Sequence, residues 1–280
     1  MAAKSTDLVV TLTGGSSNSN PNLSIGGDPS SYPVTGQLNN LFDNVAREEA
    51  SVGSISYRCI YIFNNNSVDT IYNLQLYTLN IVNTISTIEL GIRSEKEIQD
   101  IIITGIISDG YFTISYKPLG KTEIEYRNVN FNSNPVIWTE NLQNALRSIE
   151  SLENVTVNFN LGINNIQFKI NFDGLDDKRS HDLFNIDKTN LIGAITASVT
   201  KSSIGSPINS IPTLLDADTT IPYNVNFFET SNLTTISIGN LYPEEGFPLW
   251  IKRTVPPSSE SVAGEGFKLK ILGSPNPSIT

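Results

Sequence analysis

The stretch SISYRCIYIFN, residues 54–64, determines the fold class. Its large side chains alternate with the two-residue period of a β-strand. One face would carry Tyr57, Cys59, Tyr61 and Phe63, and the other Arg58, Ile60 and Ile62. Because both sets contain large apolar residues, the pattern predicts a strand that is buried on at least one side.

Several similar runs surround this stretch. Residues 70–81, TIYNLQLYTLNI, follow the turn NNNSVD and are predicted to pair with residues 54–64 as an antiparallel neighbour. Further strands are predicted at residues 6–13, 87–93, 221–229, 233–241, 246–256 and 266–273. Charged residues make up only 16% of the chain, whereas long helices are usually rich in Glu and Lys. The sequence therefore predicts an all-β protein.

The middle of the chain has a different pattern of predicted elements, because it includes a helix. From Glu97 to Gly205 the runs follow the order β-β-β-α-β-β, which predicts a small β-rich α+β domain. Its one helix, TENLQNALRSIE, is predicted to begin with Thr139 as its cap and to bury one face made of Leu142, Ala145, Leu146 and Ile149. The domain, residues 97–205, would be inserted into a β-sandwich built from residues 1–96 and 206–280, because each flanking piece alone is too small to close a core.

The N-terminal segment, the distribution of apolar residues and the net charge bear on where the protein lies and what it binds. Residues 14–33, GGSSNSNPNLSIGGDPSSYP, predict an N-terminal arm that lies over a surface or a neighbouring subunit; a flexible terminus is the alternative. No apolar leader and no run of about 18 apolar residues occur, which predicts a soluble protein with no secretion signal and no membrane partner. The net charge of −10 would repel nucleic acid.

His181 is the only histidine and stands in the charged stretch DDKRSHD. A hydrolytic triad needs a serine and an acid that converge on the imidazole. Ser180 and Asp182 are adjacent to His181 in sequence, so their side chains diverge, and Asp177 lies close by. The sequence predicts a solvated loop histidine.

Two groups of carboxylates are candidates for a calcium site and for a glycoside-cleaving site. Asp173, Asp176 and Asp177 lack the spacing of a calcium loop and predict a turn with exposed carboxylates. Asp43, Glu48 and Glu49 have no second acidic cluster with aromatic sugar platforms, as glycoside cleavage would require, and predict a capped turn before the strand.

The remaining chemically distinctive residues are predicted to be structural. Cys59 is the only cysteine, so no intrachain disulfide is possible, and its place within a strand predicts a buried, unreactive thiol. Trp138 is predicted to staple the start of the helix, and Trp250 to belong to a core. The sequence thus predicts no catalytic residue, no cofactor site, no metal site and no enzymatic activity.

Two separated segments resemble a family of tailed-phage virion proteins. The first is NNLFDNVAREEASVGSISYRCIYIFN and the second is LYPEEGFPLWIKRTVPPSSESVAGEGFKLKILG. Family members pair an LFDxV and YRCIY segment with a C-terminal W and RTVP segment. The resemblance spans residues 38–64 and 236–273.

The middle section is similar to a repeat domain of phage virion proteins. The match covers EIQDIIITGIISDGYFTISYKPLGKTEIEY, WTENLQNALRSIESLENVTVNFN and IQFKINFDGLDD. Residues that stand where the pattern expects them are Gly110, Thr113, Thr122, Ala145, Leu146, Val155 and Val157. This copy lacks most of the alanines and glycines of the pattern. Neither resemblance implies a catalytic residue.

The resemblances imply a non-enzymatic structural protein of the phage particle, assembled in the cytoplasm of a bacterial host. The preferred role is a capsid decoration, cement or head-fibre protein that contacts the major capsid protein and forms a homo-oligomer. The alternatives are a tail or baseplate component, including a fibre adaptor, and a glycan-binding module. A glycan-binding module would need exposed aromatics in a groove, and Tyr111, Tyr116 and Tyr126 mostly alternate with apolar residues.

Overall fold

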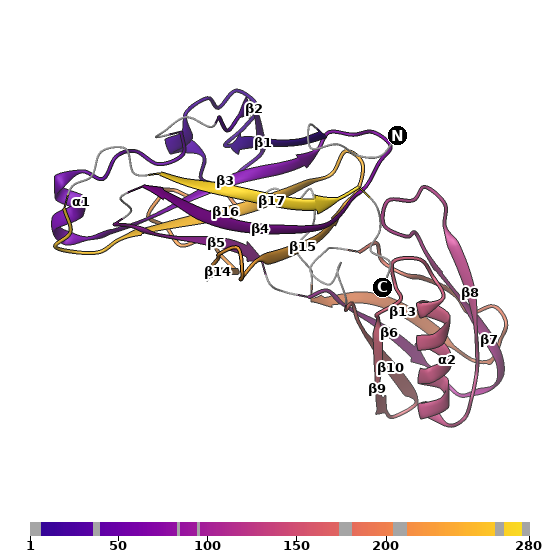
Figure 1. Cartoon of the computed structure of the whole chain (residues 1–280). Helices are drawn as coiled ribbons and strands as arrows, with labels where there is room; N and C mark the ends of the chain where they lie inside the picture. The colour runs from indigo at the N-terminus through magenta and orange to yellow at the C-terminus, as the bar shows by residue number, and fades with distance from the viewer. Residues whose placement is uncertain are drawn as a thin grey trace. The chain divides into compact units, whose positions relative to one another are not determined.

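The computed structural model describes residues 7–35, 40–82, 85–93, 96–173, 181–203, 212–260 and 266–275. The chain divides into two units, which are coloured by position along the chain in Figure 1. Unit 1 consists of Met1–Ser94 and Ile208–Thr280, and unit 2 of Glu95–Pro207. Antiparallel strands dominate both units, which confirms the all-β class.

Unit 1 is a sandwich of two sheets. The six-stranded sheet has the order β14 (Val225–Glu229), β5 (Thr87–Arg93), β16 (Gly246–Val255), β3 (Ser54–Asn64), β1 (Leu8–Thr13) and β2 (Pro29–Pro33). The three-stranded sheet has the order β15 (Ile236–Leu241), β4 (Ile71–Val82) and β17 (Gly266–Ser274). Apolar residues of both sheets form one core cluster, in which Ile62, Leu74 and Leu249 are fully buried.

The predicted pairing of residues 54–64 with residues 70–81 is wrong. Strand β3 pairs with β1 on one side and β16 on the other, while β4 belongs to the opposite sheet. Leu74 and Leu76 of β4 share the core cluster with Ile60 and Ile62 of β3, so the two strands face one another across the sandwich. Alternation shows that a strand has a buried face, but it does not show whether the next strand lies beside it or opposite it.

Unit 2 packs two sheets and one helix around its own core. One sheet has the order β13 (Thr196–Ser203), β6 (Ile98–Thr104), β10 (Asn165–Asn171) and β9 (Thr156–Gly162). The other joins β7 (Ile107–Tyr116) to β8 (Glu125–Asn130) and to the short strands β11 (Asn185–Asp187) and β12 (Leu191–Gly193). The core cluster draws on both sheets and on α2 (Pro135–Arg147), with Ile101, Phe112, Leu142 and Phe168 fully buried.

The helix of unit 2 begins earlier than the sequence predicted. Helix α2 starts at Pro135, and the Asn134 side chain caps it by accepting a hydrogen bond from the Val136 amide at 3.0 Å. Thr139 is not the cap, because it lies inside the helix and its hydroxyl donates to the Pro135 carbonyl at 2.7 Å. Trp138 lies within the helix and is buried against Phe168, so its predicted role as a staple is also wrong. An asparagine followed by a proline is the sequence signal for a helix that starts here, because asparagine is a favoured cap and proline is favoured at the first helical position.

Two short helical segments were not predicted. Helix α1 (Arg47–Val52) precedes β3, and a 3₁₀ turn, η2 (Pro21–Leu23), lies between β1 and β2. The segment around η2 is tied to the six-stranded sheet, because the Ser24 hydroxyl donates to the Cys59 carbonyl at 2.6 Å and accepts from the Thr13 amide at 2.8 Å. The predicted N-terminal arm therefore lies over the sandwich to which it belongs.

Each unit contains a pair of neighbouring strands close to the residues where the chain changes units. In unit 1, β5 and β14 are paired, and the end of β5 at Arg93 lies opposite the start of β14 at Val225. In unit 2, β6 and β13 are paired, and Ile98 lies opposite Ser203. In unit 2 the first and last strands are therefore neighbours, whereas in unit 1 Pro212, Leu215 and Asp218 form main-chain hydrogen bonds with other parts of the unit before β14 begins.

Candidate functional site

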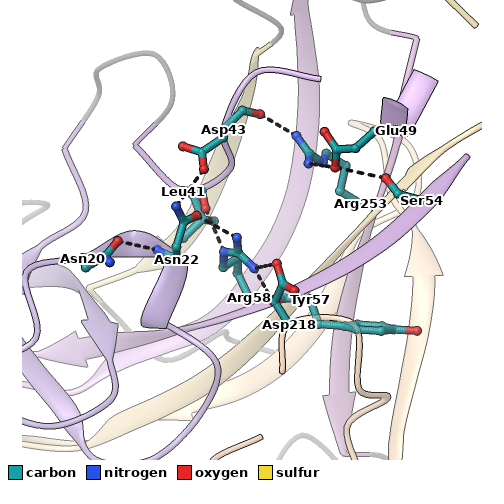
Figure 2. A network of polar contacts seen from close by, with 10 residues as sticks. All are labelled: Asn20, Asn22, Leu41, Asp43, Glu49, Ser54, Tyr57, Arg58, Asp218 and Arg253. Carbon is teal, nitrogen blue, oxygen red and sulfur yellow. Dashed lines mark hydrogen bonds and ion pairs between the residues drawn. The ribbon is translucent and has the colours of Figure 1, made fainter. Parts of the chain in front are cut away.

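The segments that carry the family resemblance meet at one place in unit 1. Figure 2 shows that Leu41 and Asp43 from the LFD stretch, Arg58 from the YRC stretch and Arg253 from the RTV stretch lie together. We call this group, with Phe42 and Glu49, the arginine network. It joins parts of the chain separated by as many as 210 positions, as between Asp43 and Arg253.

Arg58 is the most heavily engaged member of the network. Its guanidinium is only 4% exposed and donates to the Leu41 carbonyl at 3.1 Å and the Tyr57 carbonyl at 3.0 Å. It also donates to the carboxylate of Asp218 and to the side-chain oxygen of Asn22, each at 2.8 Å. A planar fork with five N–H groups suits such a set of acceptors, which a lysine could not reach at once.

Arg253 occupies the neighbouring position on β16. Its guanidinium donates to the Asp43 carbonyl at 2.6 Å and to Oε1 of Glu49 at 3.3 Å. The Phe42 ring lies close to both arginines, with guanidinium carbons 5.2 Å (Arg58) and 5.0 Å (Arg253) from its centroid. Both distances permit a cation–π interaction.

The carboxylates of this region have structural partners. Glu49 accepts from the Ala46 amide at 2.9 Å at the start of α1, and from the Ser54 hydroxyl at 3.2 Å. Asp43 accepts from the Asn22 side chain at 2.7 Å. The short helix α1 lies directly ahead of β3, where a capped turn was predicted. The arginines of this region donate to main-chain carbonyls, and the carboxylates accept hydrogen bonds from an amide and from polar side chains. These hydrogen bonds attach the loops to the sandwich.

A second polar cluster lies in unit 2 and overturns the prediction for His181. The imidazole is 2% exposed, not solvated, and stacks on Phe172 with 4.0 Å between ring centroids. Its Nδ1 lies 2.8 Å from the hydroxyl of Tyr116. The charged residues around His181 in the sequence predicted exposure to solvent. The aromatic residues that cover the ring lie outside that charged stretch: Tyr116 ends β7, and Phe172 directly follows β10. The triad residues Asp177 and Ser180 lie outside the described residues.

Glu97 is the centre of this cluster, which we call the Glu97 cluster together with Gln99, His181 and Lys201. Glu97 is fully buried and accepts from Lys201 Nζ at 3.0 Å, from Gln99 Nε2 at 2.7 Å and from the His181 amide at 3.1 Å. Lys201 Nζ also donates to the His181 carbonyl. Gln99 accepts from the Phe184 amide at 3.0 Å. The cluster thereby holds the segment from His181 to Phe184 against β6 and β13.

Sequence reasoning missed Glu97, Gln99 and Lys201. A signal was present, because Gln99 alternates in step with Ile101 and Ile103 on the buried face of β6. A polar residue in phase with core residues predicts a buried polar contact, although its partner comes from the fold.

The suggested calcium position is only partly described, since Asp176 and Asp177 fall outside the described residues. Asp173 binds Lys96 Nζ at 2.8 Å and the Thr156 hydroxyl at 2.9 Å. Burial acts to raise the pKa of the Asp173 carboxyl, but the hydrogen bonds from Lys96 and Thr156 outweigh it and lower the pKa below its usual value. Within the described ranges, no group of three or more Asp, Glu, His or Cys residues is placed to share a metal ion.

A pH dependence follows from the lowered pKa of Asp173. The charged carboxylate stabilises unit 2 above the pKa of the unfolded chain, about 3.9, and that contribution is lost as the pH falls through the folded-state pKa. We expect the urea midpoint of Asp173→Asn to fall less steeply at acidic pH than that of the wild-type chain. The Trp138 fluorescence of a Trp250→Phe background reports on unit 2. Glu140→Gln, at an exposed position of α2, is the control and should leave the profile unchanged.

Cys59 is fully buried, as predicted, in a small cluster with Tyr57 and Trp250 on the second face of β3. Burial raises the pKa of its thiol well above the ordinary value. We therefore expect the native protein to be inert to a thiol reagent such as dithionitrobenzoate, and to react with one equivalent once it is unfolded in urea. Reaction of the native protein at the rate of a free thiol would contradict this placement.

The remaining aromatic candidates are dispersed. Tyr116 is 1% exposed and belongs to the core, so it provides no ligand platform, whereas Tyr126 on β8 is 63% exposed. Trp250 is buried, as predicted. In the described part of the chain, no helix is long and apolar enough to span a membrane.

Comparisons with known proteins show no family for this chain. No family model matches it, and no curated protein matches it. Among solved structures, the D1-D2-D3 domains of the flagellar cap protein FliD from Escherichia coli share 10% identity over 75% of this chain and 59% of that chain, with a TM-score of 0.22. The D2-D3 domains of the same protein share 13% identity over 72% of this chain and 98% of that chain, also at 0.22. The chain thus spans under two thirds of the first of these structures, and a TM-score of 0.22 carries no argument about fold or function.

Proposed function

We propose that this chain is a non-enzymatic structural protein of a tailed-phage particle, in the role of a capsid decoration, cement or head-fibre protein. The observation that supports the proposal is the convergence of the LFD, YRC and RTV residues in the arginine network. Residues that carry a resemblance to virion proteins are the same residues that join the two separated parts of unit 1. They act on main-chain carbonyls and on one another, as residues that maintain a scaffold do.

The proposed mechanism is protein–protein contact. A stable specific interface buries roughly 1,200–2,000 Å² of total surface, and each unit of this chain has its own core and could offer such a surface. One unit would dock on capsid subunits while the other remains available for further contacts. Burial of apolar and main-chain surface on the shell would stabilise the shell against the pressure of the packaged DNA.

The first test is the copy number of the chain in purified particles, measured by quantitative mass spectrometry against the major capsid protein. Hundreds of copies are expected for a protein that decorates the shell. Roughly six to eighteen copies would match the ring symmetries of a neck, tail or baseplate and would replace the capsid role with the tail alternative. Absence from the particles would overturn the virion proposal.

A second test addresses the cement role directly. Particles assembled without this chain should release their DNA at a lower temperature than complete particles, because the shell would lack the added contacts. Addition of the purified protein should restore the release temperature. Identical release temperatures with and without the chain would exclude a cement function.

A further inference from the structure

We propose that the free edge of β9 pairs with β9 of a second copy of this chain, as an antiparallel, two-fold symmetric contact. The inference goes beyond a virion role, because it rests on the geometry and composition of one strand. It would join the four-stranded sheets of two unit 2 copies into one continuous sheet.

Strand β9 differs from the other edge strands of the described sheets. Edge strands carry unpaired main-chain groups, and natural proteins protect them with charges, prolines, bulges or short length. Strands β11 and β12 have three residues each, and β15 has two register shifts. Strand β13 has a register shift near its end. The protecting residues on the others are Pro29 and Pro33 on β2, Glu229 on β14, Lys268 and Lys270 on β17, and Glu125 and Arg127 on β8. Strand β9, TVNFNLG, has no charge and no proline, and it pairs with β10 at seven consecutive positions without a bulge.

The hairpin register shows which groups of β9 face outward. Gly162 lies opposite Asn165 across a two-residue turn, which makes this a hydrogen-bonded pair, and such pairs then recur at every second residue. The main-chain groups of Phe159 and Leu161 therefore point away from β10. Side chains of α2 already cover the first part of the edge, because Gln143 accepts from the Val157 amide at 3.0 Å and Arg147 donates to the Val155 carbonyl at 2.9 Å. The part of the edge that remains for pairing is Asn158–Gly162.

This short segment is self-complementary in antiparallel orientation. With the two-fold axis at Asn160, Phe159 of one copy lies opposite Leu161 of the other, and both pairs can exchange their outward N–H and C=O groups. An aromatic residue opposite an apolar one is a favourable cross-strand pair. The antiparallel arrangement also places the two α2 helices at opposite ends of the contact, because α2 covers only the start of β9.

Charge favours a second copy at this edge. Two chains that each carry a net charge of −10 repel one another over most of their surfaces, so they can approach most closely where the surface is neutral. Strand β9 and its turn are neutral from Thr156 to Asn164. Leu161 within the segment is 64% exposed and Ile163 in the adjoining turn is 93% exposed, and both would lose contact with water in the pair.

A cysteine placed on the proposed axis tests the register. In Asn160→Cys the two thiols would lie opposite each other at a non-hydrogen-bonded pair, with Cα atoms about 4.5 Å apart, within the range for a disulfide. Mild oxidation should give a disulfide-linked dimer at low protein concentration. The matched control is Asn158→Cys, which would face Gly162 of the other copy and should form no disulfide-linked dimer. Cys59 is fully buried and contributes no background. Equal cross-linking of both variants, or of neither, would overturn the proposal.

A proline variant tests the contact without a cross-link. Leu161→Pro removes only an outward N–H, which an edge strand tolerates, whereas Leu161→Thr keeps the N–H and removes the apolar side chain. Sedimentation of the full chain at rising concentration should show a doubling of mass, and Leu161→Pro should weaken dimerisation by at least about tenfold relative to Leu161→Thr. Unchanged Trp138 fluorescence, measured in the Trp250→Phe background, would show that unit 2 remains folded. A wild-type chain that stays monomeric up to millimolar concentration would overturn the proposal. A chain that dimerises but is absent from particles would overturn only the virion role.

Discussion

Replacement of Glu97 by Ala is expected to lower the free energy of unfolding of unit 2 by about 4 kcal/mol, the range typical of breaking a buried ion pair. The Glu97 side chain is fully buried and accepts hydrogen bonds from Lys201, Gln99 and the His181 amide. Its removal leaves the partly exposed ammonium of Lys201 and the N–H donors of Gln99 and His181 without this acceptor. The loss is dominated by those unsatisfied partners and not by the pair's own attraction.

The measurement is urea unfolding followed by Trp138 fluorescence in the Trp250→Phe background, so that the signal arises in unit 2. Glu150→Ala is the matched control, because Glu150 pairs with Lys121 at 3.3 Å on the surface with 62% of its side chain exposed. An exposed pair of this kind contributes about 0–1 kcal/mol. A Glu97→Ala effect no larger than that of Glu150→Ala would show that the cluster does not stabilise the unit.

Replacement of Arg58 by Ala is expected to destabilise unit 1 by about 3 kcal/mol. Asp218, Asn22 and the Leu41 carbonyl would lose their donor, and the Phe42 ring would lose one of its two guanidinium neighbours. For a unit of this size the change corresponds to a fall in melting temperature of about 6–12 °C. Arg58→Lys should recover less than half of the loss, because one ammonium group cannot reach acceptors on several sides.

Trp250 in a Trp138→Phe background reports on this transition, since Trp250 lies in the core of unit 1. Arg47→Ala is the control: Arg47 is exposed on α1 and makes no hydrogen bond or ion pair with the described residues. If Arg58→Ala and Arg47→Ala unfold at the same temperature, the arginine network is not what holds the loops to the sandwich.

The two polar clusters differ in how much of them the sequence could predict. The LFD, YRC and RTV stretches stand out in the sequence through their resemblance to virion proteins, but the sequence assigns no role to the individual residues of the arginine network. Nothing in the sequence indicated that Arg58 and Arg253 both lie over the Phe42 ring, because those residues are separated by as many as 211 positions. In the Glu97 cluster, the sequence predicted a solvent-exposed His181. Hydrophobic periodicity depends only on the residues of the segment itself, so it gives no information on the aromatic rings that cover the histidine.

The sequence by itself determined the all-β class and the position of the strands with a clear alternation. Alternation located β3 at residues 54–64 and β5 at residues 87–93, because a strand with a buried face needs a period of two regardless of its neighbours. The tertiary structure alone decided that β4 lies across the sandwich from β3, that Glu97 and His181 are buried together, and that the segment before β2 lies on its own sheet. These features depend on which surfaces meet, and such contacts join residues far apart in the chain whose types are compatible with several partners.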